Sequence, residues 1–329
     1  MYIDINRIAV IGAGISGLTL AKSLKEKYDV VIFEKSQGVG GRMATRRRDS
    51  YQFDHGAQCF NVHSKDFKSF IAPFIELKLI KMWNPRIATI EKGKKPCELQ
   101  WPEPHYMPTP KMTSLAKKMS MDLDIRLNTK IIKIQKKDGN WQLFSEDGIC
   151  YGLFQWVALA LPAPQALALT PHTFSEIKVL KSIRMKGCYS LLIGLEGPWP
   201  FSWQAAKVKN SSIGWIAAHQ GGTPKKQHTS IVVHSTNDWA ENHMDIVNIE
   251  VQSMLVKELD ELLASELPTP IHMEIHKWKY AMTEMSASSN FLMDQRNCLA
   301  ICGDWCLGDR VEDAFLSAKR LAKKIWQCD

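Results

Sequence analysis

The chain has 329 residues, of which 45% are hydrophobic and 23% are charged. These values are ordinary for a folded protein, and at about 150 residues per domain the length predicts roughly two domains. They exclude a disordered tail, a collagen-like fibre and a disulfide-stapled miniprotein. The formal net charge of +8 favours an anionic partner such as a nucleotide, a nucleic acid or a membrane surface, without choosing among them.

The eight cysteines are too sparse for a disulfide framework and form no Cys-x-x-Cys pair. Cys302 and Cys306 lie four residues apart, but no second Cys/His pair follows to complete a zinc site, so we expect no metal. Reduced thiols indicate a cytoplasmic protein. Two apolar runs, 8–21 and 153–169, are interrupted by glycines or by prolines and glutamines, so we expect no membrane attachment.

The first elements predict a β-α-β unit. Residues 7–11 form a continuously apolar, β-branched run typical of a buried parallel strand. Residues 15–28 carry apolar side chains at helical spacing, and residues 30–33 resemble the first run. The stretch 36–58 is rich in glycine and arginine, shows little periodicity and indicates a loop.

The middle of the chain predicts a β-meander inserted into this α/β pattern. Asp-Gly pairs between the short runs are turn signals. The expected helices are 64–79, 246–263 and 311–326, and the expected strands are 131–134, 141–145, 149–154, 157–161, 271–280 and 299–302, with a strand-rich region at 188–235.

The loop between the first strand and helix, Gly12-Ala-Gly-Ile-Ser-Gly17, has the spacing of a dinucleotide site. Gly12 permits the tight turn, Gly14 lets the backbone approach a pyrophosphate, and Gly17 lets helix and strand pack closely. The helix N-terminus offers free N–H groups to that pyrophosphate. Glu34, at the end of the second strand, is expected to accept hydrogen bonds from ribose hydroxyls and to repel a 2′-phosphate.

Features further along the chain favour FAD over NAD at this site. Arg42 follows the Gly40-Gly41 pair, and its planar fork suits a pyrophosphate. Gly303-Asp304 precedes the last amphipathic helix, where an acid can bind a polyol chain and a helix N-terminus can stabilise negative charge on a reduced ring. A ribityl chain and an isoalloxazine give a reason for both features, whereas NAD does not.

These residues carry a family resemblance. The segments Gly12-Ala-Gly-Ile-Ser-Gly-Leu18, Glu34-Lys35 and Gly40-Gly-Arg-Met43 resemble the amine-oxidase-type flavoproteins. More narrowly, the chain resembles the renalase family in the segments Met43-Ala-Thr-Arg46, Asp54-His-Gly-Ala-Gln58, His276-x-Trp278-x-Tyr280-Ala281, Cys302-Gly-Asp-Trp-Cys-Leu-Gly308 and Arg310-Val-Glu-x-Ala-Phe-Leu-Ser317. Little outside these blocks matches between about residues 80 and 270. The segment Tyr106-Met-Pro-Thr-Pro-Lys-Met-Thr113 departs from the family, because relatives tend to have a glycine-containing turn there.

The resemblance implies an α/β fold with a Rossmann-like FAD/NAD(P)-binding domain and a second, mixed or antiparallel β-sheet substrate domain, in the amine-oxidase or p-hydroxybenzoate-hydroxylase topology. We expect the FAD domain over 1–75, 112–172 and 292–329, and the substrate domain over 76–111 and 173–291. The implied FAD is non-covalent, since no motif for a flavin–cysteine bond is present. The implied cofactor-binding residues are Gly12, Ala13, Gly14, Ser16, Gly17, Glu34, Lys35, Gly41, Arg42, Gly56, Ala57, Gln58, Ile132, Gly303, Asp304, Val311 and Glu312.

Trp278 and Tyr280 are two apart on a predicted strand, so they share a face and are candidates for the substrate cavity wall; core packing is the alternative. His276 shares that face and is interpreted as a core histidine, and His55 lies in the flavin loop. Residues Arg46–Arg48 with Arg42 form a basic cluster that resembles a nucleic-acid patch, but its place beside a pyrophosphate site favours a dinucleotide. Because a flavin carries the chemistry of hydride transfer, no residue is assigned as acid or base.

The resemblance implies oxidation of dihydronicotinamide isomers, 2- or 6-dihydroNAD(P), by hydride transfer to flavin, with O2 reduced to H2O2. Two alternatives remain open. One is an amine oxidase or another FAD-dependent oxidoreductase of the same superfamily, and the other is a redox-inactive flavin-binding regulatory protein. The expected partners are a small-molecule substrate and O2, with no nucleic acid and no membrane. The oligomeric state is not predicted.

Overall fold

The computed structural model describes residues 6–223, 226–264 and 267–328. Its first layer is a six-stranded, mostly parallel sheet assembled from distant parts of the chain. In spatial order the strands are β19 (Leu292–Asp294), β20 (Leu299–Ile301), β13 (Trp156–Leu159), β1 (Arg7–Ile11), β2 (Asp29–Phe33) and β9 (Asp124–Arg126). The predicted α/β class and Rossmann-like arrangement are confirmed, because strands from both ends of the chain pair in parallel around β1.

Both faces of this sheet are covered, which explains its continuously apolar strands. Ile8 and Val10 of β1 belong to one core, and the alternate residues Ala9 and Ile11 belong to another. The first core is closed by helices α1 (Ile15–Leu24), α2 (Lys65–Glu76), α3 (Thr113–Ser120) and α8 (Val311–Trp326). The second is closed by the three-stranded sheet β10 (Ile131–Lys137), β11 (Asn140–Ser145) and β12 (Cys150–Phe154) and by helices α4 (Ala163–Leu169) and α5 (Ile177–Ser182).

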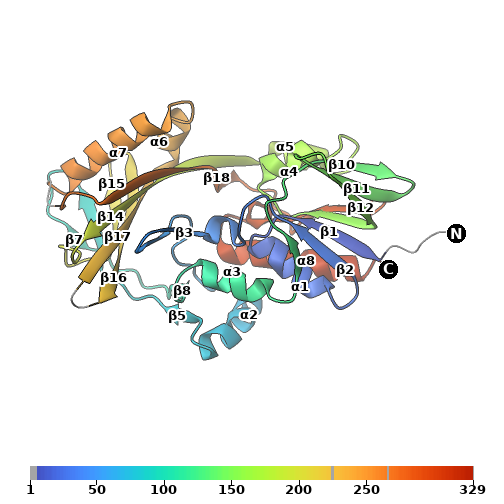
Figure 1. Ribbon diagram of the computed structural model, residues 1–329, viewed down its shortest axis with the longest axis horizontal. Coiled ribbons are helices and arrows are strands. Elements are labelled where there is room, and N and C mark those ends of the chain that lie inside the picture. Colours follow the sequence, from blue (N-terminus) through green and yellow to red (C-terminus); the bar gives the residue numbers. More distant parts are fainter. Residues whose placement is uncertain (1–5, 224–225, 265–266, 329) are drawn as a thin grey trace.

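A seven-stranded sheet forms the other half of the molecule, at the left of Figure 1. Its order is β18 (His272–Met285), β14 (Arg184–Glu196), β17 (Lys226–Ser235), β16 (Ile213–Thr223), β15 (Ala205–Lys209), β6 (Ile87–Glu91) and β7 (Cys97–Glu98). Helices α6 (Asn237–Asn242) and α7 (Asn248–Leu262) pack on it through a third core. The long strands β14 and β18 reach from this sheet toward the six-stranded sheet (Figure 1).

Two small two-stranded sheets complete the fold: the hairpin of β3 (Thr45–Arg48) with β4 (Tyr51–Asp54), and the pair of β5 (Ile80–Met82) with β8 (Tyr106–Pro108). Tyr51 and Phe53 of β4 bury their rings against residues of the seven-stranded sheet. The expectation of a loop over 36–58 is therefore wrong for its second half. Arginine-rich β3 lacks an apolar repeat because it lies along a cleft, and a short 3-10 turn, η1 (Gly41–Met43), precedes it.

Two other expected boundaries need correction. Helix α1 ends at Leu24 instead of residue 28, since Lys25–Tyr28 form turns. Strand β18 runs to Met285, five residues beyond the expected end, because it pairs along its length with β14. The predicted domain boundaries remain a prediction. None of the helices in the described ranges combines the length and the apolar character needed to cross a membrane.

Candidate functional site

A large cleft runs between the two halves of the molecule. Its volume of about 1870 Å³ exceeds the roughly 300–1,000 Å³ of a usual small-molecule site. One wall is built by the glycine loop, the residues after β2, and hairpin strand β3. The facing wall is built by β18 and the ends of β14, β16 and β17. The cleft therefore has room for a cofactor and a second ligand together.

The glycine loop fits a pyrophosphate. A Cβ added at Gly17 would lie 1.9 Å from the Gly12 carbonyl oxygen, and one at Gly12 would lie 2.5 Å from the Ala160 carbonyl oxygen, so the backbone packs tightly there. A Cβ at Gly14 would meet nothing within 4 Å, and Gly14 lines the cleft. No side chain caps the start of α1, which leaves its first N–H groups available to an anion. Gly14 thus presents open backbone toward a ligand.

Glu34 is fixed by the backbone around it. Its Oε2 accepts from the Ala13 N–H at 2.8 Å, and its Oε1 accepts from the Ser36 N–H at 2.8 Å. The residue is 8% exposed and still lines the cleft. Each carboxylate oxygen can accept a second hydrogen bond. The geometry suits a diol held at the end of β2.

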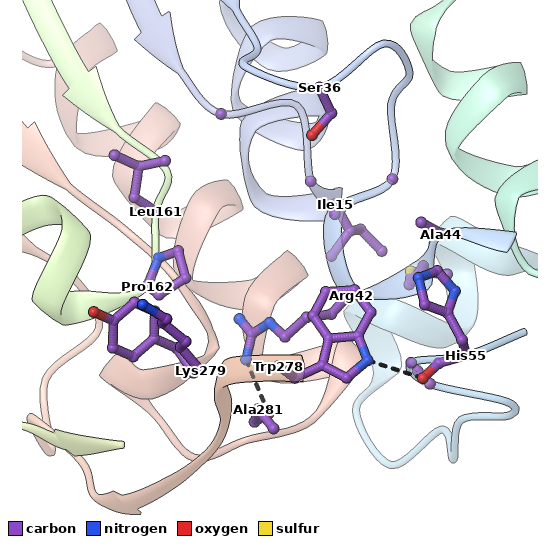
Figure 2. Close-up of a pocket in the computed structure, with 18 of the residues that line it drawn as sticks. Ile15, Ser36, Arg42, Ala44, His55, Leu161, Pro162, Trp278, Lys279 and Ala281 are labelled. Atoms are coloured by element: carbon purple, nitrogen blue, oxygen red, sulfur yellow. Dashed lines mark hydrogen bonds between the residues drawn. The ribbon is translucent and has the colours of Figure 1, made fainter. Parts of the chain in front are cut away.

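Arg42 bonds to the 3-10 turn after β20, η2 (Asp304–Cys306), and to strand β18. Arg42 donates to both Asp304 oxygens, at 2.7 and 2.6 Å, and to the Ala281 carbonyl oxygen at 3.3 Å (Figure 2). The Arg42 carbonyl accepts from the Ala57 N–H at 2.9 Å, and a Cβ at Gly56 would lie 2.0 Å from that carbonyl oxygen. This packing brings the 40–42 and 56–57 segments together on one wall.

The structure brings most of the other predicted cofactor residues to the cleft. Those that line it are Gly12, Gly14, Ser16, Glu34, Lys35, Gly41, Arg42, Gly56, Ala57, Ile132, Gly303, Asp304 and Val311. Ala13, Gly17, Gln58 and Glu312 lie outside the lining. Ala13 reaches the site through its N–H to Glu34, and Gly17 through the backbone packing of the loop. Which of these residues bind a cofactor remains a prediction.

The Glu312 side chain binds backbone groups at the start of α2. Its carboxylate accepts from the N–H groups of His63 and Ser64, at 2.8 and 2.6 Å, and the residue is 2% exposed. These bonds join the start of α8 to the segment that caps α2. These two bonds give the Glu312 side chain a linking position, and its expected contact with a flavin remains a prediction.

The two cavity-wall candidates lie in the cleft. Trp278 and Tyr280 both line it, together with their neighbours on β18. The Trp278 indole N–H donates to the His55 carbonyl oxygen at 2.9 Å (Figure 2). The same carbonyl accepts from the Ser190 hydroxyl at 2.7 Å and lies 3.1 Å from His234 Nε2. A carbonyl oxygen with three donors fixes the Trp278 ring against the wall.

The histidines around Trp278 are held neutral. Burial, together with the nearby His276 ring and the charge of Arg46, lowers the pKa of His55 to about 3. Burial also lowers the pKa of His234 and of His276 to about 4. His276 Nδ1 lies 3.1 Å from an Arg46 nitrogen, and since a guanidinium only donates, this Nδ1 accepts. His276 is thus a hydrogen-bonded histidine that also lines the cleft.

Several cleft residues were missed because their region matched no motif. They are Lys186, Cys188, Trp215 and His234. Trp215 donates its indole N–H to Gln58 Oε1 at 2.9 Å, and within the described residues Gln58 Nε2 and His55 Nδ1 are buried without a hydrogen-bond partner. No local signal marks these positions, since they converge only when the long strands align.

Comparison with known proteins identifies the family. A model described as an NAD(P)-binding Rossmann-like domain matches residues 10–74, and one described as a flavin containing amine oxidoreductase matches residues 100–326. The chain belongs to the flavin-containing amine oxidoreductases. It is therefore an FAD-dependent oxidoreductase, and the predicted FAD and superfamily are confirmed.

Solved structures of several oxidases share the fold along nearly the whole chain. A candidate protoporphyrinogen oxidase from Exiguobacterium sp. 255-15 has a TM-score of 0.78 and 13% identity, covering 99% of this chain and 100% of the other. Cyclohexylamine oxidase from Brevibacterium oxydans IH-35A has a TM-score of 0.74 and 11% identity, covering 98% of both chains. Putrescine oxidase bound to putrescine has a TM-score of 0.72 and 11% identity, covering 98% and 99%.

Curated relatives match over a short segment only. The 4,4'-diapophytoene desaturases of Staphylococcus haemolyticus and Staphylococcus aureus (strain Newman) are 50% identical over 50 residues and 47% identical over 51 residues. Each alignment covers 15% of this chain and 10% of the relative. The chain thus spans about a tenth of the length of these relatives.

Proposed function

We propose that this flavin-dependent oxidoreductase oxidises an anionic dihydronicotinamide dinucleotide, 2- or 6-dihydroNAD(P), as the renalase family does. The observation that carries the proposal is the charge of the cleft. Its cationic lining residues outnumber the acidic ones: Lys35, Arg42, Arg46, Arg47, Arg48, Lys117, Lys130, Lys186, Lys277, Lys279 and Arg310 against Glu34, Asp238, Asp304 and Asp309. Such a lining attracts a pyrophosphate and repels an ammonium group.

FAD would occupy the side of the cleft formed by the glycine loop. The Gly14 backbone and the start of α1 would hold its pyrophosphate, and Glu34 would accept from its adenosine ribose. Asp304 would accept from its ribityl hydroxyls, with Gly56 and Ala57 beside the ring. The open space at Gly14 and the fixed Glu34 carboxylate support this assignment. We propose that the FAD is non-covalent, so that acid precipitation releases it into the supernatant.

When bound, the flavin supplies the redox chemistry: it takes a hydride from the dihydronicotinamide carbon, and O2 with one proton then recovers those two electrons and the hydrogen as H2O2. The contribution of the protein is alignment. Trp278, fixed by the His55 carbonyl, offers a flat face against which a nicotinamide ring can stack. The neutral His55 and His276 keep positive charge away from a ring that becomes cationic.

An amine oxidase is the second candidate, and the family match favours it. Trp278 and Tyr280 in the lining suit either substrate. The products distinguish the two: under air, a dihydronicotinamide oxidase yields one H2O2 and one NAD(P)+ for each substrate consumed, whereas an amine oxidase yields H2O2 with ammonia or a smaller amine. Consumption of O2 with amines but not with 2- or 6-dihydroNAD(P) would refute the proposal. Flavin that no substrate reduces would favour the regulatory alternative.

A further inference from the structure

Strand β3 carries three consecutive arginines along one wall of the cleft. Arg46, Arg47 and Arg48 all line it. Since side chains alternate along a strand, Arg46 and Arg48 point to the same side and Arg47 points to the other. In Figure 1, β3 lies between the Rossmann-like half and the seven-stranded sheet. The two same-sided arginines face β18, where Glu274 lies two residues before His276.

Glu274 is shared by both arginines. Arg46 Nη1 donates to its Oε1, Arg48 Nε donates to its Oε2 at 2.9 Å, and Arg48 Nη2 donates to its Oε1 at 3.2 Å. Burial opposes ionisation of this carboxyl, but the hydrogen bonds and charges of the two guanidiniums lower its pKa. The carboxylate is therefore ionised at neutral pH, and it balances one of two positive charges.

The surplus charge has no other counterion among the described residues. Neither arginine forms an ion pair with a second carboxylate there. Arg46 also contacts His276, which is neutral at pH 7. The side chains of Arg46 and Glu274 are only 25% and 23% exposed, so solvent screens the surplus less than at an open surface.

Two lysines of the facing wall already have partners within the protein. Lys186 pairs with Asp238 and Glu284, at 2.7 Å each. Lys277 donates to the Met244 carbonyl oxygen at 2.7 Å and lies over the Tyr189 ring. Arg46 and Arg48, with Glu274 between them, thus form a preorganised cationic group on the cleft, which we call the β3 arginine pair.

We propose that the β3 arginine pair binds the pyrophosphate of the substrate, separately from the cofactor pyrophosphate at Gly14. The proposal rests on the proposed function, because it assumes an anionic dinucleotide substrate. Arginine forks bind phosphate oxygens through two parallel hydrogen bonds, and Glu274 holds both forks in place before a ligand arrives. Glu274 competes with the ligand for the same N–H groups, so this carboxylate limits affinity while it orders the site.

The test uses flavin-loaded protein and ADP, a pyrophosphate that cannot be oxidised. Isothermal titration at low and high salt gives its affinity. We expect Arg48→Gln to weaken ADP binding about tenfold, and Glu274→Gln to tighten it several-fold because it removes the competing negative charge. Arg126→Gln is the matched control: Arg126 pairs with Asp124 on the surface, is similarly exposed and lies outside the cleft lining. Its ADP affinity should equal that of the unmodified protein.

A purely structural role for these three side chains predicts a different effect of Glu274→Gln on ADP affinity. If the arginines and Glu274 only hold β3 to β18, Glu274→Gln weakens ADP binding or leaves it unchanged, and either result overturns the proposal. Unchanged affinity in Arg48→Gln also overturns it. Flavin content and circular dichroism of each variant show that the fold is intact. A different result would refute the proposed function alone: ADP binds as expected, but no dihydronicotinamide reduces the flavin.

Discussion

Arg42 and Asp304 lie 262 residues apart in the chain and form a two-pronged ion pair, at 2.7 and 2.6 Å. The Asp304 side chain is 4% exposed and that of Arg42 is 29% exposed. A carboxylate buried to this extent needs hydrogen bonds or an opposite charge to offset its desolvation, and the Arg42 guanidinium supplies both. The pair therefore joins the turn after β2 to the 3-10 turn Asp304–Cys306 that precedes α8.

Asp304→Asn removes this charge with little change of shape. We expect FAD to bind at least tenfold more weakly, and the free energy of unfolding to fall by about 1–3 kcal/mol, since Arg42 loses a charged acceptor. Fluorescence of released FAD and urea unfolding measure the two effects. Asp309→Asn is the control, because Asp309 lines the same cleft without a hydrogen bond to Arg42. Equal FAD affinity in both variants would contradict the assignment.

Two substitutions in the glycine loop should separate an effect on FAD binding from an effect on folding. Gly14→Ala should change the free energy of unfolding of the apoprotein by less than about 1 kcal/mol, because the added Cβ meets open space, yet it should weaken FAD binding at least tenfold. Gly17→Ala places a Cβ 1.9 Å from a carbonyl oxygen and should cost about 3 kcal/mol. Urea unfolding with flavin titration checks this. Full FAD affinity in Gly14→Ala would exclude a pyrophosphate at that position.

Glu34→Gln tests the ribose contact. One amide oxygen remains to accept a backbone N–H, but the charge and one acceptor are lost, so FAD should dissociate about tenfold faster. Asp29→Asn on the same strand is the control, because its side chain is 61% exposed and pairs with Arg7 away from the cleft. The decay of bound-flavin absorbance after dilution gives both rates. Indistinguishable rates would remove Glu34 from the site.

The part of the fold that the sequence predicts is the part with local signals. The strand at Arg7–Ile11, the glycine loop and the helix at Val311–Trp326 lie where their patterns indicate, because apolar periodicity and glycine spacing act over short distances. The β3–β4 hairpin was missed because arginines that line the cleft stand where an apolar repeat would mark a strand.

Hydrogen bonds between residues far apart in the chain have no local sequence pattern that predicts them. Glu312 bonds to Ser64 across 248 residues, and the His55 carbonyl meets Ser190, His234 and Trp278 only after four segments have assembled. Each of these residues is compatible with several partners when it is considered alone. Their roles follow from the pairing of β14 with β17 and β18, which the sequence pattern does not specify.

The neutral His55 makes stability depend on pH. An unfolded histidine binds a proton below about pH 6.5, whereas folded His55 does so only near pH 3. The unfolded state thus binds more protons in this window, so the free energy of unfolding falls as the pH is lowered from 6.5 and is unaffected above it. His55→Gln should reduce the loss between pH 7 and pH 5 by about 2 kcal/mol. Parallel urea curves that shift equally with pH would contradict this.

The central claim is hydride acceptance from an anionic dihydronicotinamide, and anaerobic rapid mixing tests it most directly. Flavin-loaded protein is mixed with 2- or 6-dihydroNAD(P), or with primary amines, and the flavin absorbance is followed. We expect rapid bleaching by at least one dihydronicotinamide isomer, slowed when its transferred hydrogen is deuterium, and no bleaching by amines. Bleaching by amines alone would exclude a dihydronicotinamide as the hydride donor.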